Sequence, residues 1–203
     1  MLPSNASAAG TVPACERSLR RLRRERIDLC LLHWPGRHPL AATVEAFERL
    51  VAQGKIGAWG VSNFDVDGMR ELAALPGGAR CATNQVCYAL SRRGAAFDLF
   101  PWMGARAVPA MAYCPLDEGR LVEHPALAPI ARELGATPAQ VALEWLLAPG
   151  PHGAGVIAIP KTASVARVEE NVATAALRLS VEQLAALDRA FPPPARKVPL
   201  ATA

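Results

Sequence analysis

Five short apolar runs, separated by longer amphipathic segments, constrain the fold of this chain more than any other feature of its sequence. The runs span residues 27–33, 56–63, 81–86, 108–115 and 156–160. Each is nearly continuous in hydrophobicity and is bounded by turn residues, which is the pattern of strands covered on both faces. Strands that alternate with helices form βαβ units, so the sequence predicts an α/β fold with a parallel sheet.

The segment after the first run predicts an amphipathic helix with a recognisable end. Leu40, Val44, Phe47 and Val51 lie on one helical stripe, and Gly54 follows where a C-terminal cap belongs.

Three further helices are predicted from capping residues. Asp65 caps a helix that ends before the Pro-Gly-Gly breaker at 76–78. Thr137 and Gln140 have the spacing of a capping box, with a proline at the first helical position, and Ser180 and Gln183 repeat it. The proline-rich tail after residue 193 is expected to be irregular.

Two architectures fit such units, an open doubly wound sheet and a (β/α)8 barrel. No GxGxxG follows the first strand, so the dinucleotide-binding fingerprint of the open sheet is absent. Polar residues stand instead at the strand ends, where the strands of a barrel share one mouth. They are His33, Ser62, Asn63, Gln85, Tyr113, Lys161 and Thr162. This arrangement favours the barrel.

Composition excludes several classes of function. Hydrophobic residues make up 51% and charged residues 20%, as in an ordinary globular domain, and the net charge of +4 is too small to argue for nucleic acid. The arginine-rich stretch at 20–26 is expected to be a solvated helix face. No apolar leader or membrane-length run is found, so a cytoplasmic protein is expected. The five cysteines include no CxxC pair and no zinc-site spacing.

At these residues the sequence resembles an aldo-keto reductase. The resemblance rests on LLHWPG at 31–36, GKIGAWGVSNF at 54–64, TNQVCY at 83–88, AYCPL at 112–116 and IPKTASVARVEEN at 159–171. It runs over residues 14–193, and by order and spacing it corresponds to strands four to eight of the barrel. The HWPG, GVSNFD and PGG segments are most similar to bacterial reductases of methylglyoxal and related small aldehydes. The implied fold is a (β/α)8 barrel truncated at its N-terminus, with about five of its eight βα units.

The resemblance gives the strand ends of the first three runs specific roles. His33 would orient or polarise the substrate carbonyl, and Trp34 would line the substrate pocket. Ser62, Asn63 and Gln85 would hydrogen-bond the carboxamide of the nicotinamide. An amide ligand needs both donors and acceptors, which these side chains provide.

The later segments would hold the rest of an NADP(H) cofactor. Tyr113 would stack on the nicotinamide ring, for which an aromatic face is suited. Cys114 and Leu116 would border the cofactor, with Cys114 standing where relatives commonly have serine near the pyrophosphate. That substitution weakens one contact.

The last motif resembles the family's clamp on the adenosine end. Lys161, Thr162 and Arg167 match the residues that hold the 2'-phosphate of NADP, and Glu170 and Asn171 match the adenine contacts. Paired cationic groups at a helix start suit a phosphate monoester.

The family's catalytic aspartate, tyrosine and lysine belong to the first three βα units, which this chain is expected to lack. Neither Tyr88 nor Tyr113 matches the catalytic tyrosine. The implied function is NADP(H)-dependent reduction of small aldehydes and 2-oxoaldehydes to alcohols, with this chain near-silent in catalysis. A non-catalytic partial barrel that binds NADP(H) or a partner, and an inactive truncated gene product, remain alternatives.

The expected organisation is a loose leader over residues 1–13, a partial barrel over 14–193 and an irregular tail over 194–203. Five strands cannot close a barrel. The first and last strands are apolar and lack a blunting lysine, so their open edges predict self-association. A small carbonyl substrate is the expected ligand besides the cofactor, and neither nucleic acid nor a membrane is expected as a partner.

Overall fold

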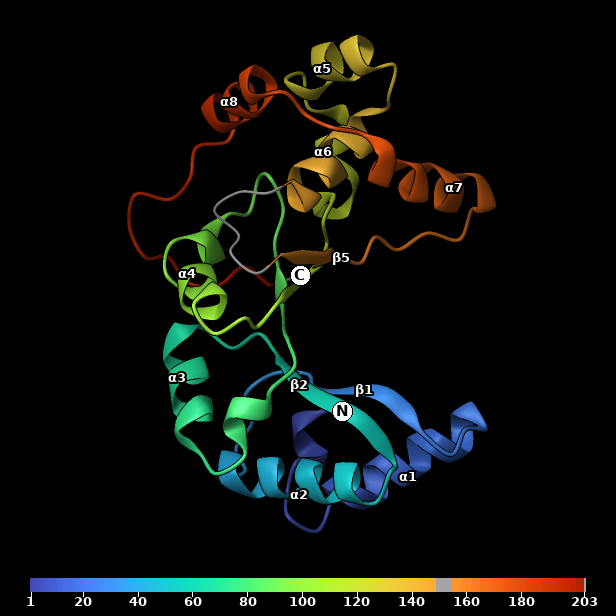
Figure 1. The fold of residues 1–203 in the computed structure, drawn as a ribbon, viewed down its shortest axis with the longest axis vertical. Coiled ribbons are helices and arrows are strands. Elements are labelled where there is room, and N and C mark those ends of the chain that lie inside the picture. Colours follow the sequence, from blue (N-terminus) through green and yellow to red (C-terminus); the bar gives the residue numbers. More distant parts are fainter. Residues whose placement is uncertain (149–154, 203) are drawn as a thin grey trace. The chain divides into compact units, whose positions relative to one another are not determined.

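The computed structural model describes residues 1–148 and 155–202 of the chain. It divides into two compact units, Met1–Gln85 and Val86–Ala203 (Figure 1). The strands and helices alternate along the chain, and the strand pairs β1–β2, β2–β3 and β4–β5 are all parallel. The α/β class with parallel strands is therefore confirmed.

The first unit contains three helices, two strands and the beginning of a third strand. In chain order its elements are η1 (Pro3–Asn5), α1 (Thr11–Leu22), β1 (Ile27–Leu32), α2 (Leu40–Ala52), β2 (Ile56–Ser62), α3 (Val66–Ala74), η2 (Gly78–Arg80) and β3 (Asn84–Cys87). Ile27 stands opposite Ile56 in the β1–β2 pair, and Ser62 stands opposite Gln85 in the β2–β3 pair. The second of these registers places the last residue of β2 beside the second residue of β3.

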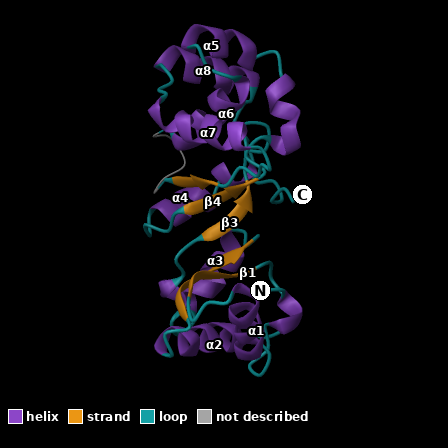
Figure 2. Ribbon diagram, turned by 90° about the vertical axis from the view of Figure 1, so that its right-hand side faces the viewer, coloured by secondary structure: helices purple, strands orange, loops and turns teal. Residues whose placement is uncertain are grey.

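Helix α2 supplies the core of this unit, as its apolar stripe predicts. Val44, Phe47 and Leu50 are buried, and the ring of Phe47 stacks on Trp59 of β2 with 5.6 Å between centroids. Figures 1 and 2 show α1 and α2 side by side, next to β1 and β2. Gly54 follows the helix with a φ of 70°, a conformation that glycine adopts without a steric penalty.

The leader differs from the expectation, because it is packed rather than loose. Pro3, Ala6 and Thr11 are buried, and the buried Thr43 hydroxyl donates to the Ala6 carbonyl at 2.7 Å. The expected boundary at residue 14 does not separate an unstructured segment from the fold, since α1 already begins at Thr11. The physical reason is that small apolar leader residues bury against α2 and their backbone groups find partners.

Met1 also changes the expected edge of the first strand. Its amino group donates to the Leu31 carbonyl at 2.6 Å, and the His33 amide donates to the Met1 carbonyl at 3.0 Å. This is the hydrogen-bond pattern of one parallel bridge, so Met1 covers the last positions of the β1 edge. That edge is less open than the sequence predicted.

The arginine-rich stretch is exposed as expected but is not one helical face. Helix α1 ends at Leu22, and Arg23 adopts the left-handed conformation with a φ of 53°. Arg24 and Arg26 therefore lie beyond the helix, in the turn before β1.

The second unit carries most of the helices. Its elements are η3 (Gly94–Ala96), α4 (Leu99–Gly104), β4 (Ala110–Tyr113), η4 (Asp117–Glu123), α5 (Leu127–Leu134), α6 (Pro138–Leu147), β5 (Val156–Ala158), α7 (Val165–Ala173), η5 (Thr174–Ala176) and α8 (Val181–Ala190). Both predicted capping boxes are present, at the starts of α6 and α8. Residues 192–202 form neither helix nor strand.

The strands of this unit are shorter than the apolar runs that predicted them. Strand β4 ends where Cys114 turns into the left-handed region with a φ of 51°, and β5 ends two residues before Pro160, which has no amide hydrogen for a ladder. The core forms instead around α6, where Trp145 stacks on the fully buried Tyr88 with 5.7 Å between centroids.

Helix α7 differs from the other helices of the unit because none of its residues is buried. Val165, Val168 and Val172 share a helical stripe and are 76%, 49% and 70% exposed. In the part of the chain that the structure describes, no helix is long and apolar enough to cross a membrane.

Candidate functional site

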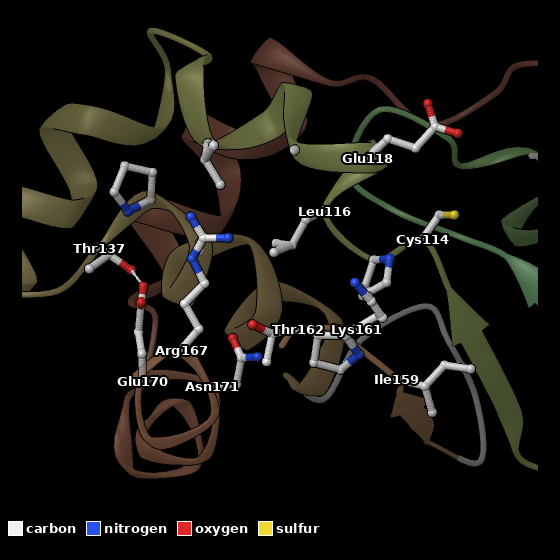
Figure 3. A pocket seen from close by; sticks show the side chains of 16 residues that line it. Cys114, Leu116, Glu118, Thr137, Ile159, Lys161, Thr162, Arg167, Glu170 and Asn171 are labelled. Atoms are coloured by element: carbon white, nitrogen blue, oxygen red, sulfur yellow. Dashed lines mark hydrogen bonds between the residues drawn. The ribbon is translucent and has the colours of Figure 1, made fainter. Parts of the chain in front are cut away.

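A cavity of about 610 Å³ in the second unit gathers most of the residues predicted to bind a cofactor. Four segments line it: the loop after β4, the start of α6, the segment after β5, and α7 (Figure 3). The predicted residues on its wall are Cys114, Leu116, Lys161, Thr162, Arg167, Glu170 and Asn171. Tyr113 is the last residue of β4 and lies next to this wall in sequence.

Two cationic side chains of the cavity are not neutralised by the protein. Lys161 and Arg167 are exposed and form no ion pair or side-chain hydrogen bond with residues 1–148 or 155–202. Ser164 caps α7 by accepting from the Arg167 amide at 3.5 Å, and the Thr162 hydroxyl accepts from the Ser164 amide at 3.1 Å. Two uncompensated cations near a helix N-terminus form a site suited to a phosphate group.

The start of α6 is tied to α7 across the cavity wall. The Thr137 hydroxyl donates to the carboxylate of Glu170, and the Gln140 side-chain amide donates to the Glu170 carbonyl at 3.0 Å. Figure 3 shows the Thr137–Glu170 bond beside the side chains of Arg167 and Asn171. Thr137 was predicted only as a helix cap, because a capping box does not indicate which neighbouring helix the hydroxyl contacts.

The loop after β4 reaches the cavity through strained backbone. Cys114, Asp117 and Glu118 all have positive φ, at 51°, 49° and 58°. Non-glycine residues adopt this region at a cost, so surrounding contacts must hold the loop in place.

Asp117 supplies those contacts. Its carboxylate accepts from Arg92 Nε at 2.6 Å and from the Ser91 hydroxyl at 2.9 Å, and Arg120 lies at 3.5 Å. Burial opposes ionisation of Asp117, but the hydrogen bonds from Arg92 and Ser91 outweigh it, so the pKa of this carboxyl lies below its ordinary value. No local sequence pattern indicates the pairing of Arg92 with Asp117, because 25 residues separate them.

The first unit brings together the residues predicted for the nicotinamide end. The Ser62 hydroxyl donates to the Gln85 carbonyl at 2.9 Å, and the Asn63 side-chain amide donates to the His33 carbonyl at 3.0 Å. Asn63 has a φ of 61°, which asparagine tolerates better than most residues. The His33 and Trp34 rings lie 4.6 Å apart, and both side chains are exposed.

Ser62 and Asn63 therefore also stabilise the fold, since each donates a hydrogen bond to a backbone carbonyl, of Gln85 and of His33 respectively. His33, Ser62 and Asn63 lie at the carboxyl ends of β1 and β2, where parallel α/β folds place ligands, whereas Gln85 is the second residue of β3 rather than its end, because β3 runs on to Cys87. This group of residues belongs to the first unit, and the cavity belongs to the second.

Tyr88 is unsuited to act as a general acid. Its side chain is fully buried, and its ring packs against Phe100 with 4.6 Å between centroids. Burial raises the pKa of Tyr88 well above its ordinary value. Tyr113 is half-buried at the end of β4.

Parallel α/β units with polar residues at strand ends, and a cavity lined by two cations, are features of nucleotide-binding enzymes. Within that class, the chain belongs to the aldo/keto reductase family, whose model matches residues 1–191.

Two curated relatives and one solved structure show the extent of the likeness. The chain is 46% identical to Methylglyoxal reductase YeaE of Escherichia coli (strain K12), over 98% of this chain and 70% of that protein. It is 35% identical to Glyoxal reductase of Bacillus subtilis (strain 168), over 88% and 62%. A crystal structure of an aldo/keto reductase from Klebsiella pneumoniae in complex with NADP and acetate matches with a TM-score of 0.95 and 46% identity, covering 100% of this chain and 72% of that one.

These matches correct the predicted extent of the family region. The match begins at residue 1 rather than 14, in agreement with the packed leader, and the placement of the chain as the C-terminal part of the family is not borne out. The truncation of the barrel and the roles of single site residues stay predictions.

The ion pair of Asp117 generates a pH-dependent prediction. Asp117→Asn should lower the free energy of unfolding by about 1–3 kcal/mol at neutral pH, because a hydrogen-bonded charge pair is lost. A lowered carboxyl pKa stabilises the folded state above the unfolded pKa of about 3.9, and this stabilisation is lost as pH falls through the folded pKa. Urea unfolding at neutral pH and near pH 3 should therefore show the difference from wild type shrinking in acid.

The neighbouring carboxylate provides the control. Glu118 is exposed and, among residues 1–148 and 155–202, its ion pair is with the exposed Arg120, at 3.1 Å, so Glu118→Gln should change stability little at either pH. A difference between wild type and Asp117→Asn that is the same at both pH values would contradict the assignment.

Proposed function

We propose that the chain binds NADP(H) and serves the NADP(H)-dependent reduction of small aldehydes and 2-oxoaldehydes to alcohols. The observation that carries the proposal is the pair of uncompensated cations, Lys161 and Arg167, at the start of α7 in a cavity of about 610 Å³. The names of the relatives, a methylglyoxal reductase and a glyoxal reductase, support the substrate class. The solved relative with NADP supports the cofactor.

The residues present fit the adenosine end of this cofactor. Lys161, Thr162 and Arg167 would hold the 2'-phosphate, since two cations and a hydroxyl near a helix N-terminus match a phosphate monoester. Glu170 and Asn171 line the same cavity and would meet the adenine. In these roles the negative charge of the phosphate would match the positive charge of the cavity.

The nicotinamide end would be held by other residues. Ser62, Asn63 and Gln85 would bind the carboxamide, and Tyr113 would stack on the ring. Cys114 and Leu116 would border the cofactor between the two ends. We infer that both units belong to a barrel of the (β/α)8 type, as the likeness of the whole chain to the solved reductase supports.

Reduction requires a hydride on the carbonyl carbon and a proton on the oxygen. The bound cofactor supplies the hydride. His33 would orient and polarise the carbonyl, and Trp34 would form one wall of the substrate pocket, for which its 44% exposure leaves room. A donor aimed at the oxygen stabilises the charge that develops there.

A non-catalytic NADP(H)-binding role is the second candidate function. The observation that favours it concerns the two tyrosines of the chain. Tyr88 is buried with a raised pKa, and Tyr113 is assigned to the ring-stacking position. Neither is placed to supply the proton that the family takes from a tyrosine. Binding would then persist without turnover.

The cofactor preference is tested at Arg167. Arg167→Ala should weaken NADPH binding by about tenfold or more, because a charge-assisted bond to the 2'-phosphate is lost, and should leave NADH binding almost unchanged. Fluorescence titration of both cofactors measures this. Arg189→Ala, at an exposed arginine on α8 outside the cavity lining, is the matched control and should change neither affinity. Equal losses for the two cofactors in Arg167→Ala would refute the assignment.

Turnover separates the two candidate functions. If the chain has the non-catalytic role, NADPH oxidation in the presence of methylglyoxal should be about 10²- to 10⁴-fold slower than that of Methylglyoxal reductase YeaE assayed alongside, because a general acid is lacking. A rate equal to that of the relative would exclude the non-catalytic role and show that another group donates the proton. His33→Gln would then test whether the exposed His33 is that group.

Self-association through an open strand edge is a further prediction, as is the cytoplasmic location. Ile157 of β5 is 46% exposed, and this three-residue edge contains no charged side chain. Size-exclusion chromatography with light scattering should give a mass above that of the monomer, and Ile157→Lys should lower it. A monodisperse monomer for the wild-type chain would show that the edge does not mediate association.

A further inference from the structure

The hydroxyl of Thr137 takes part in two hydrogen bonds at the cavity wall. As the cap of α6 it accepts from the Gln140 amide at 3.2 Å, and at the same time it donates to Oε1 of Glu170. Gln140 is also used twice, because its side-chain oxygen accepts from the Thr137 amide and its nitrogen donates to the Glu170 carbonyl, both at 3.0 Å. The residue that caps α6 therefore also holds the side chain of Glu170 on α7.

These hydrogen bonds engage Oε1 and the backbone carbonyl of Glu170 and leave its Oε2 available to a ligand. Oε2 of its carboxylate has no hydrogen-bond partner among residues 1–148 and 155–202, and Glu170 lines the cavity together with Arg167 and Asn171 (Figure 3). An ionised carboxylate accepts hydrogen bonds and cannot donate them. The cavity thus presents a fixed acceptor beside the cation pair.

Resting on the proposed binding of NADP(H), we propose that Thr137 is a specificity-determining positioning residue. It holds the Glu170 carboxylate so that Oε2 accepts from the exocyclic amino group of adenine, and the cavity thereby prefers adenine to a base that carries a carbonyl at that position. Two acceptors facing each other repel and leave both without a donor. A carboxylate that is not held can rotate into solvent, and the preference is then lost.

The test compares two cofactors that differ in the group at C6 of the base and in the hydrogen that the carbonyl form carries on N1. NADPH carries the amino group of adenine, and reduced nicotinamide hypoxanthine dinucleotide phosphate carries a carbonyl in its place. Calorimetric titration of both gives a ratio of affinities. For wild type we expect a preference for NADPH of about tenfold, the value of one charge-assisted hydrogen bond.

Four variants separate positioning from helix capping. Thr137→Val removes both the cap and the donor, and the ratio should fall to about twofold or less. Thr137→Asp keeps a capping side chain but cannot donate, so it should also lose the preference while it remains folded. Thr137→Ser retains the hydroxyl and should keep the wild-type ratio. Ser180→Ala removes the cap of α8, away from the cavity lining, and should lower the melting temperature without changing the ratio.

The outcomes distinguish this inference from the function on which it rests. Wild-type protein that binds NADPH but does not discriminate between the two bases overturns the role of Thr137 and leaves the proposed function standing. The same holds if Thr137→Val and Thr137→Asp retain the wild-type ratio, or if Ser180→Ala loses it. Wild-type protein that binds neither cofactor overturns both.

Discussion

Parallel pairing of the strands is the constraint on which the remaining structure depends. Two parallel strands cannot be joined by a tight turn, so each strand is followed by a crossover that is helical in most of this chain. Within each unit the crossovers return the paired strands in the same direction, so that polar residues at strand ends collect at one edge. His33, Ser62 and Asn63 meet in this way, and the hydrogen bonds that Ser62 and Asn63 donate to backbone carbonyls hold this region in place.

The cavity of the second unit combines rigid and uncompensated groups. Asp117 is held by Ser91 and Arg92, and this pairing fixes a loop whose backbone is strained. Lys161 and Arg167, by contrast, have no protein partners in the described parts of the chain. Uncompensated cations beside a fixed wall favour an anionic ligand, because such a ligand gains charge-assisted bonds without displacing existing ones. The contrast distinguishes the groups that shape the cavity from those left for a ligand.

Much of this arrangement could be predicted from the sequence, because it depends on local patterns. The stripe of Val44 and Phe47 and the caps at Asp65 and Ser180 act within a few residues, and each is confirmed. The motif from residue 159 to 171 placed the cavity residues near one another.

What the sequence did not predict depends on contacts between distant residues. Met1 pairs with β1 across 30 residues, Arg92 pairs with Asp117 across 25, and Thr137 reaches Glu170 across 33. The local interpretations of Met1 as part of a leader and of Thr137 as a helix cap concealed their distant partners, while no local pattern pointed to Arg92. The strand limits failed for a related reason, since a positive φ at Cys114 ends β4 before its apolar run does.

Helix α7 has no buried side chain, and its local unfolding free energy is therefore expected to be low within the second unit. A helix that buries nothing gains little from the hydrophobic effect, so its local unfolding free energy rests on the Ser164 cap and on the bonds that Thr137 and Gln140 make to Glu170. Its amide hydrogens are then among the first of the unit to exchange with solvent. A ligand held by Arg167 and Glu170 would bind only the folded helix and would therefore stabilise α7 against local unfolding.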